Sequence, residues 1–306
     1  MLSGFPGSGK STLGRSYDGY TIISRDNLGK DYKAVLKELE KKIEAGENVV
    51  LDNTNLTVDA RKPFIDMAKK YGAKIKCVWI DTDIETCFIN VLRRNWERYG
   101  NISFTGKGHP NDPNIFSPAV LFSARKNHER PMVDEGFDSV DVIEGMKAMF
   151  DPAVYTNRAV FFDIDGTLRK TDHLKNKYPT CVDEVELYTD IKKMKKVIGK
   201  YKDHMFFGVS NQSGISKGVV TEESVEQCMN KTKELLDVEM EIKWCPHRAA
   251  PITCYCRKPQ SGMGVYFIEK YRVNPRESIM VGDQTTDKTF ATRLGMRFIH
   301  VDKFFD

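Results

Sequence analysis

The sequence Ala159-Val160-Phe161-Phe162-Asp163-Ile164-Asp165-Gly166-Thr167-Leu168 decides the fold of the second half of this chain. Four apolar residues run directly into two carboxylates one residue apart, followed by a glycine and a hydroxyl. A short apolar run that ends in this way is typical of a strand buried on both faces of a sheet. Ligands of α/β sheets gather at the carboxyl ends of such strands, where Asp163 and Asp165 are expected to lie.

Two carboxylates this close repel each other unless a cation lies between them. We therefore interpret Asp163 and Asp165 as part of a Mg²⁺ site with oxygen ligands. The alternative is a strand followed by an ordinary Asp-Gly turn, which would explain the pair taken alone. That alternative predicts no partner residues further along the chain.

Length and composition indicate a two-domain protein without a membrane span. The 306 residues suggest two domains, and 29% charged with 40% apolar residues gives material for two cores. The net charge of +4 permits an acidic partner without requiring one. No apolar run approaches the roughly 20 residues of a membrane span, and no signal peptide precedes the first motif. The scattered cysteines favour reduced thiols and a cytoplasmic location; they are Cys77, Cys87, Cys181 and Cys228.

The chain opens on a phosphate-binding loop. Residues 4–12 read GFPGSGKST and match the pattern GxxxxGK[ST], in which backbone N–H groups bind phosphate oxygens. Lys10 is expected to reach the β- and γ-phosphates of ATP, and Ser11 is expected to hold Mg²⁺. An accidental Gly-rich loop is the weaker alternative. The nucleotide-binding set is completed by Gly7, Gly9 and Thr12. Because only three residues precede the loop, either the first strand is predicted to be very short or the start of the chain has been trimmed.

Polar residues follow the next predicted elements of the first half. A strand over 20–24 ends in Arg25-Asp26, where the carboxylate could hold metal or accept a proton from an attacking hydroxyl. A strand over 48–52 precedes Asn53-Thr54-Asn55, which could equally cap a helix over 57–71 or contact a ligand. A helix from about residue 84 carries Arg94 and Arg98 on one face. These arginines could clamp a phosphoryl group or simply be solvated.

These motifs resemble the kinase half of polynucleotide kinase–phosphatases, in the kinase-first order of the phage-type enzyme. The resemblance covers roughly residues 1–140 and rests on the loop, Arg25-Asp26, the DNTN sequence at 52–55 and the RNxxR sequence at 94–98. It implies that Asp26 is the general base on a 5′-hydroxyl, and that Arg94 and Arg98 bind ATP and the transition state. It also implies that the acceptor strand lies near Arg25, Thr54 and Asn55.

Partners for Asp163 follow in the second half. A buried strand over 206–209 ends in Ser210-Asn211, whose hydroxyl and amide suit phosphate oxygens. Lys258 supplies a cation, and a strand over 279–282 ends in Asp283, with Asp287 four residues later. The four pieces in this order resemble the signatures of the haloacid dehalogenase superfamily of phosphatases.

This resemblance implies hydrolysis in two steps. Asp163 attacks phosphorus to give an aspartyl-phosphate, and Asp165 protonates the leaving alcohol and later deprotonates water. Mg²⁺ is held by Asp163, the backbone of Asp165 and Asp283. Asp287 orients the water shell of the metal or caps a helix. The phosphoryl group is bound by Ser210, Asn211 and Lys258.

Three cysteines and a histidine lie within twelve residues: Cys245, His247, Cys254 and Cys256. The C-x-H and C-x-C spacings allow all four to meet at one tetrahedral Zn²⁺. A closed Cys₃His set predicts a structural zinc, with chance clustering as the alternative. The set resembles the zinc loop of histidinol-phosphate and heptose-bisphosphate phosphatases. Its place just before Lys258 predicts that zinc stiffens the loop that presents this lysine.

The sequence therefore predicts an α/β protein with two three-layer αβα domains. We expect a P-loop kinase domain with an arginine lid over 1–148, a linker over 149–158, and a haloacid dehalogenase-like Rossmannoid domain with a zinc loop over 159–306. The residues 100–116 are expected to form a lid or loop. The intervals between the phosphatase motifs leave no room for a large cap domain, so the second site is expected to be open.

Our preferred hypothesis is a nucleic-acid end-healing enzyme that phosphorylates 5′-OH ends with ATP and hydrolyses 3′-phosphates. A kinase and a phosphatase on the same atom would consume ATP uselessly, whereas on opposite ends of a break they prepare it for a ligase. The resemblance is compatible with DNA or RNA ends and with a homo-oligomer. The alternative is a small-molecule (sugar) kinase fused to a heptose- or histidinol-phosphate-like phosphatase. A non-enzymatic binding module is disfavoured by the intact Lys10, Asp26, Asp163 and Asp165.

Overall fold

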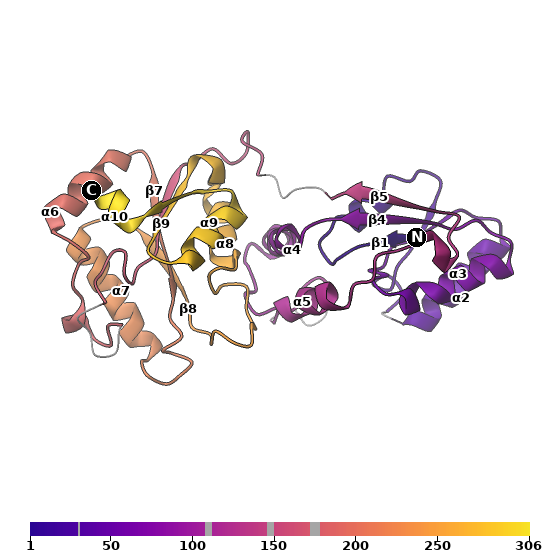
Figure 1. Cartoon of the computed structure of the whole chain (residues 1–306), viewed down its shortest axis with the longest axis horizontal. Helices are drawn as coiled ribbons and strands as arrows, with labels where there is room; N and C mark the ends of the chain where they lie inside the picture. Colours follow the sequence, from indigo (N-terminus) through magenta and orange to yellow (C-terminus); the bar gives the residue numbers. More distant parts are fainter. Residues whose placement is uncertain (30, 108–111, 146–149, 172–177) are drawn as a thin grey trace. The chain divides into compact units, whose positions relative to one another are not determined.

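A computed structural model of the chain describes residues 1–29, 31–107, 112–145, 150–171 and 178–306. Its contacts divide the chain into two compact units. The first unit comprises Met1–Val91 and His109–Met149, and the second comprises Leu92–Gly108 and Phe150–Asp306. Each unit has a parallel sheet with helices packed on it (Figure 1), so the predicted class of two αβα domains is confirmed. Residue 149, the first of the predicted linker, lies outside the described residues.

The first unit is built on short parallel strands. β1 (Leu2–Ser3) pairs with β4 (Lys76–Asp81), which pairs with β5 (Ser139–Glu144). β2 (Thr21–Ile23) pairs with β3 (Val49–Leu51), and a single bridge between Leu2 and Asp52 joins the two groups. The prediction of a very short first strand is confirmed, because β1 has two residues.

Helices connect these strands, and their apolar faces form the core of the first unit. Val35 and Leu39 are four residues apart in their helix and pack with Phe64 of the next helix and Leu51 of β3. The Lys- and Glu-rich side of the same helix is left to solvent, as its spacing predicts. The helical elements are α1 (Lys10–Gly14), α2 (Tyr32–Glu44), α3 (Val58–Lys70), α4 (Ile84–Tyr99), α5 (Pro118–Asn127) and the 3₁₀ turn η1 (Val133–Glu135).

The second unit contains a five-stranded parallel sheet in the order β10-β9-β6-β7-β8. Its central strand is β6 (Ala159–Phe162), whose four residues are all buried, as their unbroken apolar run predicts. Successive side chains of a strand point to opposite faces. Accordingly, Val160 and Phe162 join one core cluster, while the ring of Phe161 contacts that of Phe207 at a tilt and that of Phe267 edge-on. The other strands are β7 (Met205–Asn211), β8 (Glu241–Cys245), β9 (Ile279–Gly282) and β10 (Arg297–His300).

Helices cover both faces of this sheet (Figure 1). The cluster around Val160 and Phe162 receives side chains from α6 (Ile191–Ile198), α7 (Glu222–Leu236) and α10 (Val301–Phe305). On the other face, Phe267 belongs to α8 (Gly262–Tyr271), which packs closely against α9 (Thr285–Leu294) at Gly264. The remaining short turns are η2 (Val182–Glu184), η3 (Gly199–Tyr201) and η4 (Pro275–Glu277).

The segment after the middle of α4 packs with the second unit. The ring of Trp96 lies 5.7 Å from that of Tyr266 in α8, and the carbonyl of Phe104 accepts a hydrogen bond of 2.7 Å from the backbone N–H of Tyr255. Residues 100–107 of the predicted lid or loop therefore belong to the second unit, while residues 112–116 belong to the first. Residues 108–111 lie outside the described residues. Helix α4 begins in one unit and ends in the other.

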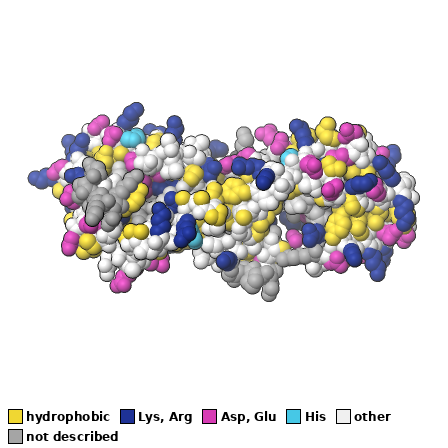
Figure 2. Space-filling view, turned by 60° about the horizontal axis from the view of Figure 1, so that its bottom comes forward, with side chains coloured by type: hydrophobic (Ala, Val, Ile, Leu, Met, Phe, Trp, Pro, Cys, Tyr) yellow, Lys and Arg dark blue, Asp and Glu magenta, His cyan; other side chains and the backbone are white. Residues whose placement is uncertain are grey.

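Acidic and basic side chains are interspersed on the face shown in Figure 2, in keeping with the small net charge of +4. Across the described ranges, we find no helix that combines the length and the apolar composition of a membrane span.

Candidate active sites

The phosphate-binding loop of the first unit is held by α4. The side-chain amide of Asn90 donates to the carbonyl of Gly7 (2.9 Å). Gly7 has φ +83°, and a Cβ there would lie 2.7 Å from the carbonyl oxygen of Cys87 in α4, so only glycine allows this approach. Lys10 is buried, and its Nζ donates to the carbonyls of Gly4 (2.9 Å) and Phe5 (2.7 Å). Ser11 and Thr12 are exposed at the start of α1.

The polar residues predicted at the ends of β1, β2 and β3 meet in the structure. The backbone N–H of Gly4 donates to the carbonyl of Thr54 (3.0 Å), and the N–H of Arg25 donates to the side chain of Asn53 (2.8 Å). Asp26 is exposed in the turn that follows β2. The loop, the Arg25-Asp26 pair and the DNTN segment therefore lie at one edge of the sheet.

Asn55 has a structural environment that the sequence pattern did not show. Its side-chain amide donates to the carbonyl of Leu2 (2.7 Å), it is buried, and its φ is +47°. The expectation that residues 53–55 cap the following helix is wrong, because Thr57 caps α3 by accepting from the N–H of Ala60 (3.2 Å). Asn55 thus holds the end of β1 in place, whereas Thr54 is exposed.

The arginines of α4 lie in the part of the helix that belongs to the second unit. Arg98 is exposed, and the positive charge of the half-buried Arg94 acts on the buried Tyr255. Their neighbour Arg93, which sequence reasoning passed over, forms an ion pair of 2.9 Å with Glu269. Glu269 is buried and also accepts from the hydroxyl of Tyr155 (2.8 Å). This network fixes the last turns of α4 on α8.

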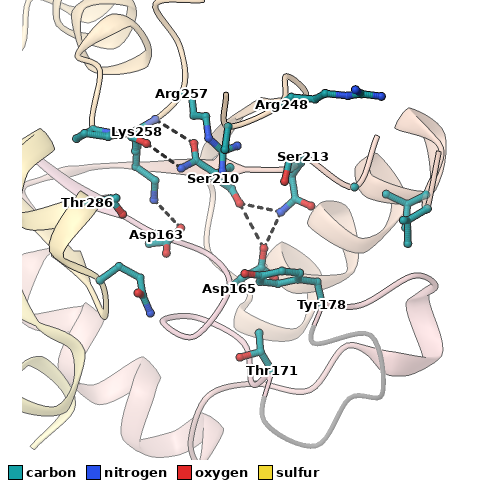
Figure 3. A pocket seen from close by; sticks show the side chains of 18 of the residues that line it. Asp163, Asp165, Thr171, Tyr178, Ser210, Ser213, Arg248, Arg257, Lys258 and Thr286 are labelled. Atoms are coloured by element: carbon teal, nitrogen blue, oxygen red, sulfur yellow. Dashed lines mark hydrogen bonds and ion pairs between the residues drawn. The ribbon is translucent and has the colours of Figure 1, made fainter. Parts of the chain in front are cut away.

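In the second unit, Lys258 lies between two buried carboxylates, and Figure 3 shows its contact with one of them, Asp163. Its Nζ is 2.7 Å from Asp163 and 2.7 Å from Asp287. Asp287 also accepts from the backbone N–H of Gln284 (3.1 Å), so it caps α9, which is one of the two roles considered for it. The strands β6 and β9 and the loop before α8 deliver these groups to one point.

A third carboxylate completes an oxygen-rich cluster. Oxygen atoms of Asp163, Asp283 and Asp287 lie within 4.8 Å of one another. Among the described residues, Oδ1 of Asp283 is buried without a hydrogen-bond partner. A Cβ on Gly166, which has φ +83°, would lie 2.7 Å from Asp283, so glycine lets the chain turn closely over it. Hard oxygen donors with an unsatisfied buried atom fit Mg²⁺.

The cluster shifts the protonation of its members. Burial raises the pKa of Asp163 to about 7; the nearby Lys258 ammonium opposes this rise, and the charge of Asp287 adds to it. Burial acts to lower the pKa of Lys258, but the carboxylates of Asp163 and Asp287 together bring it above its ordinary value. A further cation at the site would favour the ionised form of Asp163.

Asp165 is held apart from this cluster by Arg169, which sequence reasoning did not assign to the site, and by Gln212, whose amide was expected to suit phosphate oxygens. Nε of Arg169 donates to one carboxylate oxygen (2.7 Å), and the amide of Gln212 donates to the other (2.6 Å). The same amide contacts the hydroxyl of Ser210 (2.8 Å). Both residues adjoin the quoted motifs, since Arg169 follows Leu168 and Gln212 follows Asn211. Their partners, however, depend on the tertiary fold.

Asn211 acts on the backbone of Lys258. Its amide donates to the carbonyl of Lys258 (3.0 Å), and its oxygen accepts from the N–H of Lys258 (2.9 Å). Asn211 also pairs in register with Cys245 of β8. The predicted contact of Asn211 with phosphate would therefore compete with two hydrogen bonds that fix the backbone of Lys258. Ser210 and Lys258 line a cavity of about 470 Å³, and Asp163 and Asp165 line it as well.

The predicted zinc ligands come together just behind this cavity. Sγ of Cys245 is 3.4 Å from Nδ1 of His247 and 3.6 Å from Sγ of Cys254; Sγ of Cys256 is 3.3 Å from the same histidine nitrogen. The pKa of Cys254 is lowered because the thiols of Cys245 and Cys256 donate to its sulfur. The three sulfur atoms and a nitrogen of His247 lie within 4.8 Å of one another and the three cysteines are buried, so these soft S and N donors fit a metal such as zinc. Arg257, directly after Cys256, donates to the carbonyl of His247 (3.2 Å) and so connects the end of the Cys₃His segment to its beginning.

Comparison with known proteins separates the two halves. Residues 1–104 match the model of the AAA domain family, and residues 255–303 match the HAD-hydrolase-like family. A probable D-glycero-D-manno-heptose-1,7-bisphosphate 7-phosphatase of Thermoplasma volcanium is 35% identical over 150 residues, which cover 46% of this chain and 96% of that protein. The chain belongs to the HAD-like phosphatases.

Relatives of this HAD-like phosphatase chain include a protein whose name gives it two activities. The bifunctional polynucleotide phosphatase/kinase of Schizosaccharomyces pombe is 33% identical over 150 residues, covering 47% of this chain and 32% of that protein. The match thus spans about a third of the length of the S. pombe protein. The solved structure of a D,D-heptose 1,7-bisphosphate phosphatase from B. bronchiseptica has a TM-score of 0.41 and 22% identity, over 46% of this chain and 78% of that one. The chain joins a P-loop kinase domain to a HAD-like phosphatase domain, in that order.

Proposed function

We propose that this kinase–phosphatase heals nucleic-acid ends. The first unit would transfer the γ-phosphate of ATP to a 5′-hydroxyl, and the second would hydrolyse a 3′-phosphate. The observation that carries the polynucleotide substrate is the similarity to the S. pombe protein, whose name joins the same two activities. The two chemistries also make sense together only when they act on different atoms, because otherwise each turnover of one would undo the other.

In the phosphatase reaction, the residues divide into two groups. An oxygen of Asp163 attacks phosphorus, a bond to the carboxylate forms, and the bond to the 3′-oxygen breaks. Asp165, oriented by Arg169 and Gln212, gives a proton to that leaving oxygen and then takes one from the water that hydrolyses the aspartyl-phosphate.

Two further groups neutralise and hold the phosphoryl group in that reaction. Lys258 already lies 2.7 Å from Asp163, so its ammonium can contact a phosphoryl oxygen bound there. The buried hydroxyl of Ser210, 3.4 Å from a carboxylate oxygen of Asp165, offers a second donor. Bound Mg²⁺, held by Asp163, Asp283 and the backbone of Asp165, would shield the charge between the two anions.

In the kinase reaction, Lys10 of the phosphate-binding loop would exchange its hydrogen bonds to the loop for contacts with ATP. Lys10 donates to two carbonyls of its own loop, and it would donate to the β- and γ-phosphates of ATP when these fill the loop. Asp26 would accept the proton of the attacking 5′-hydroxyl, and Ser11 would hold the Mg²⁺ that accompanies ATP. Asn90, which contacts the loop, is four residues before Arg94 and eight before Arg98, so the three share one face of α4. We assign these arginines to the phosphates.

The Cys₃His cluster is proposed to hold a structural zinc ion. Its four residues leave no open ligand position, so no substrate role follows from it. A rigid loop from Cys245 to Cys256 would keep Lys258 against Asp163. None of the seven cysteines forms a disulfide, so the sulfurs of the cluster are available to bind a metal as thiolates, and this is compatible with the proposed cytoplasmic location.

A second candidate is a sugar kinase fused to a sugar-phosphate phosphatase. The match to the Thermoplasma protein favours it, because it covers nearly the whole of that protein. The two candidates differ in what the second site accepts. Purified protein should therefore be offered a 3′-phosphorylated oligonucleotide and, separately, a panel of sugar mono- and bisphosphates. We expect kcat/KM to be at least a hundredfold higher, roughly 3 kcal/mol in transition-state binding, for the oligonucleotide. A higher kcat/KM on a sugar phosphate than on the oligonucleotide would support the sugar phosphatase instead.

A further inference from the structure

The cavity of the phosphatase site extends beyond the residues that the chemistry uses. Three side chains at its rim are large, apolar and solvent-exposed: Tyr178 (44%), Val219 (58%) and Ile252 (40%). They come from separate segments, before η2, before α7 and within the Cys₃His loop. Exposed apolar residues are ordinary when single, but three around one polar cavity form a surface that an apolar group of a ligand can cover.

Two arginines also line the cavity: Arg248 within the Cys₃His loop and Arg257 directly after it. They differ in the hydrogen bonds that their guanidinium groups make. Arg257 donates to the carbonyl of His247, so its guanidinium takes part in the loop. Arg248 is exposed, and no ion pair links it to another residue in the described part of the chain. Figure 3 shows Arg248 and Tyr178 among the side chains around the cavity. A guanidinium in this position is suited to a second phosphate of the ligand.

The chemistry of the rim distinguishes between ligand classes. A sugar phosphate would bring hydroxyl groups against Val219 and Ile252, and these would lose water without gaining hydrogen bonds. A nucleoside brings a flat apolar base, which stacks on aromatic and apolar side chains without regard to its sequence. A strand also carries a phosphodiester next to its terminal nucleoside, which is the second anion that Arg248 would meet. The cavity volume of about 470 Å³ lies within the range of ligand sites.

We propose that the rim formed by Tyr178, Val219, Ile252 and Arg248 is a subsite for the terminal nucleoside of a 3′-phosphorylated strand and for the phosphodiester that precedes it. The proposal rests on the phosphatase function proposed above and adds how the polymer end is recognised. The base contacts the apolar rim, the adjacent phosphodiester contacts Arg248, and the 3′-phosphate lies between Lys258 and Asp163. The subsite reads the presence of a base and of a second phosphate, and not the base identity.

The test compares two rim variants on substrates that lack one feature each. The variants are the double change Val219→Ser with Ile252→Ser, and Arg248→Gln; all three positions are exposed, so the fold should tolerate them. Matched controls outside the cavity are Val182→Ser and Arg297→Gln. The substrates are a 3′-phosphorylated oligonucleotide, the same strand with an abasic 3′-terminal residue, a nucleoside 3′-monophosphate, and glycerol phosphate.

We expect each rim variant to lose about tenfold in kcat/KM on the oligonucleotide. The Arg248→Gln loss should vanish on the nucleoside monophosphate, which has no phosphodiester. The loss of the serine double variant should vanish on the abasic strand, which has no base. Turnover of glycerol phosphate should be unchanged in both variants, and both control variants should match the unmodified protein on every substrate.

Two results would overturn the subsite alone, and a third would overturn it together with the proposed function. Unchanged kcat/KM of both rim variants on the oligonucleotide would remove it while leaving the 3′-phosphatase intact. An equal loss on glycerol phosphate would show that the rim acts on the fold or the chemistry. If the unmodified protein ignored the 3′-phosphorylated strand but hydrolysed sugar bisphosphates, the proposed function and the subsite would both fall.

Discussion

The two phosphate sites of this chain are built in different ways. In the first unit, backbone groups and one lysine form the loop, and the predicted base Asp26 is exposed in a turn. In the second unit, Asp163, Lys258 and Asp287 are buried and ion-paired before any substrate arrives. On the proposed function, the nucleotide would complete the first site, whereas the charged groups of the second site are already paired and would also support the fold.

The largest effect that tests this contrast comes from removing the lysine of each site. Lys258→Met leaves buried carboxylates without their cation, so we expect phosphatase activity to fall about a thousandfold and the free energy of unfolding to fall by about 3–5 kcal/mol. Lys10→Met should abolish kinase activity but cost only about 1–2 kcal/mol, because it removes hydrogen bonds to loop carbonyls. Steady-state rates and urea unfolding measure both. Equal destabilisation by the two changes would break the comparison.

Removal of the metal from the Cys₃His cluster should separate the sites next. Zinc extraction with a chelator, or Cys256→Ser, is expected to lower phosphatase activity ten- to a hundredfold because the loop that presents Lys258 loosens. Kinase activity should stay the same once Mg²⁺ is restored. Cys181→Ser is the matched control, since this cysteine is exposed and outside the cluster. Phosphatase rates that persist after verified loss of the metal would contradict the role of the loop.

A smaller effect should follow from loosening Asp165. Arg169→Met removes a donor 2.7 Å from its carboxylate, so we expect kcat to fall by about tenfold with KM little changed, because proton transfer depends on position. Arg169→Lys should recover part of the rate. Arg158→Met serves as control, as this arginine forms an exposed ion pair with Glu277. A rise in KM with unchanged kcat would place Arg169 in binding instead.

The smallest expected effect is on how the stability of the fold changes with pH. Burial raises the pKa of Asp163 from 3.8 to about 7, so the folded protein binds this proton more tightly than the unfolded chain. In Mg²⁺-free buffer the resulting stabilisation is complete below about pH 4 and is lost as pH rises through 7. Asp163→Asn removes that dependence. Relative to the unmodified protein, the Tm of this variant should therefore rise by a few degrees between pH 4.5 and 7.5. If the Tm of the two proteins changed with pH in parallel, the raised pKa of Asp163 would not be the source of the pH dependence.

Local patterns predicted the buried strands of each sheet but missed some of the edge strands. The run Ala159–Phe162 is apolar throughout, because β6 is buried on both faces. The edge strand β5 mixes polar and apolar residues, and Val142 and Ile143 are exposed, so its sequence carries no clear alternation. The apolar pattern that identifies a strand arises from burial of its side chains. An edge strand buries few of them, so its sequence shows little of that pattern.

The candidate sites show the same division between local and tertiary information. Motif spacing placed Asp163, Ser210, Lys258 and Asp283 around one cavity. It did not show that Gln212 bonds to Asp165, 47 residues away, or that Asn55 holds the carbonyl of Leu2. Residue type and spacing indicate which groups can react. Which neighbours orient those groups depends on how the strands are brought together.

One measurement tests the central claim that two independent sites act on opposite ends of a strand. An oligonucleotide with a 5′-hydroxyl and a 3′-phosphate is incubated with ATP and Mg²⁺, and each end is followed by mass spectrometry after cleavage at a unique internal site. The unmodified protein should add a phosphate at the 5′ end and remove one at the 3′ end. Asp26→Asn should lose only the first change, and Asp163→Asn only the second. No change at either end with the unmodified protein, or loss of both changes in either variant, would contradict the account.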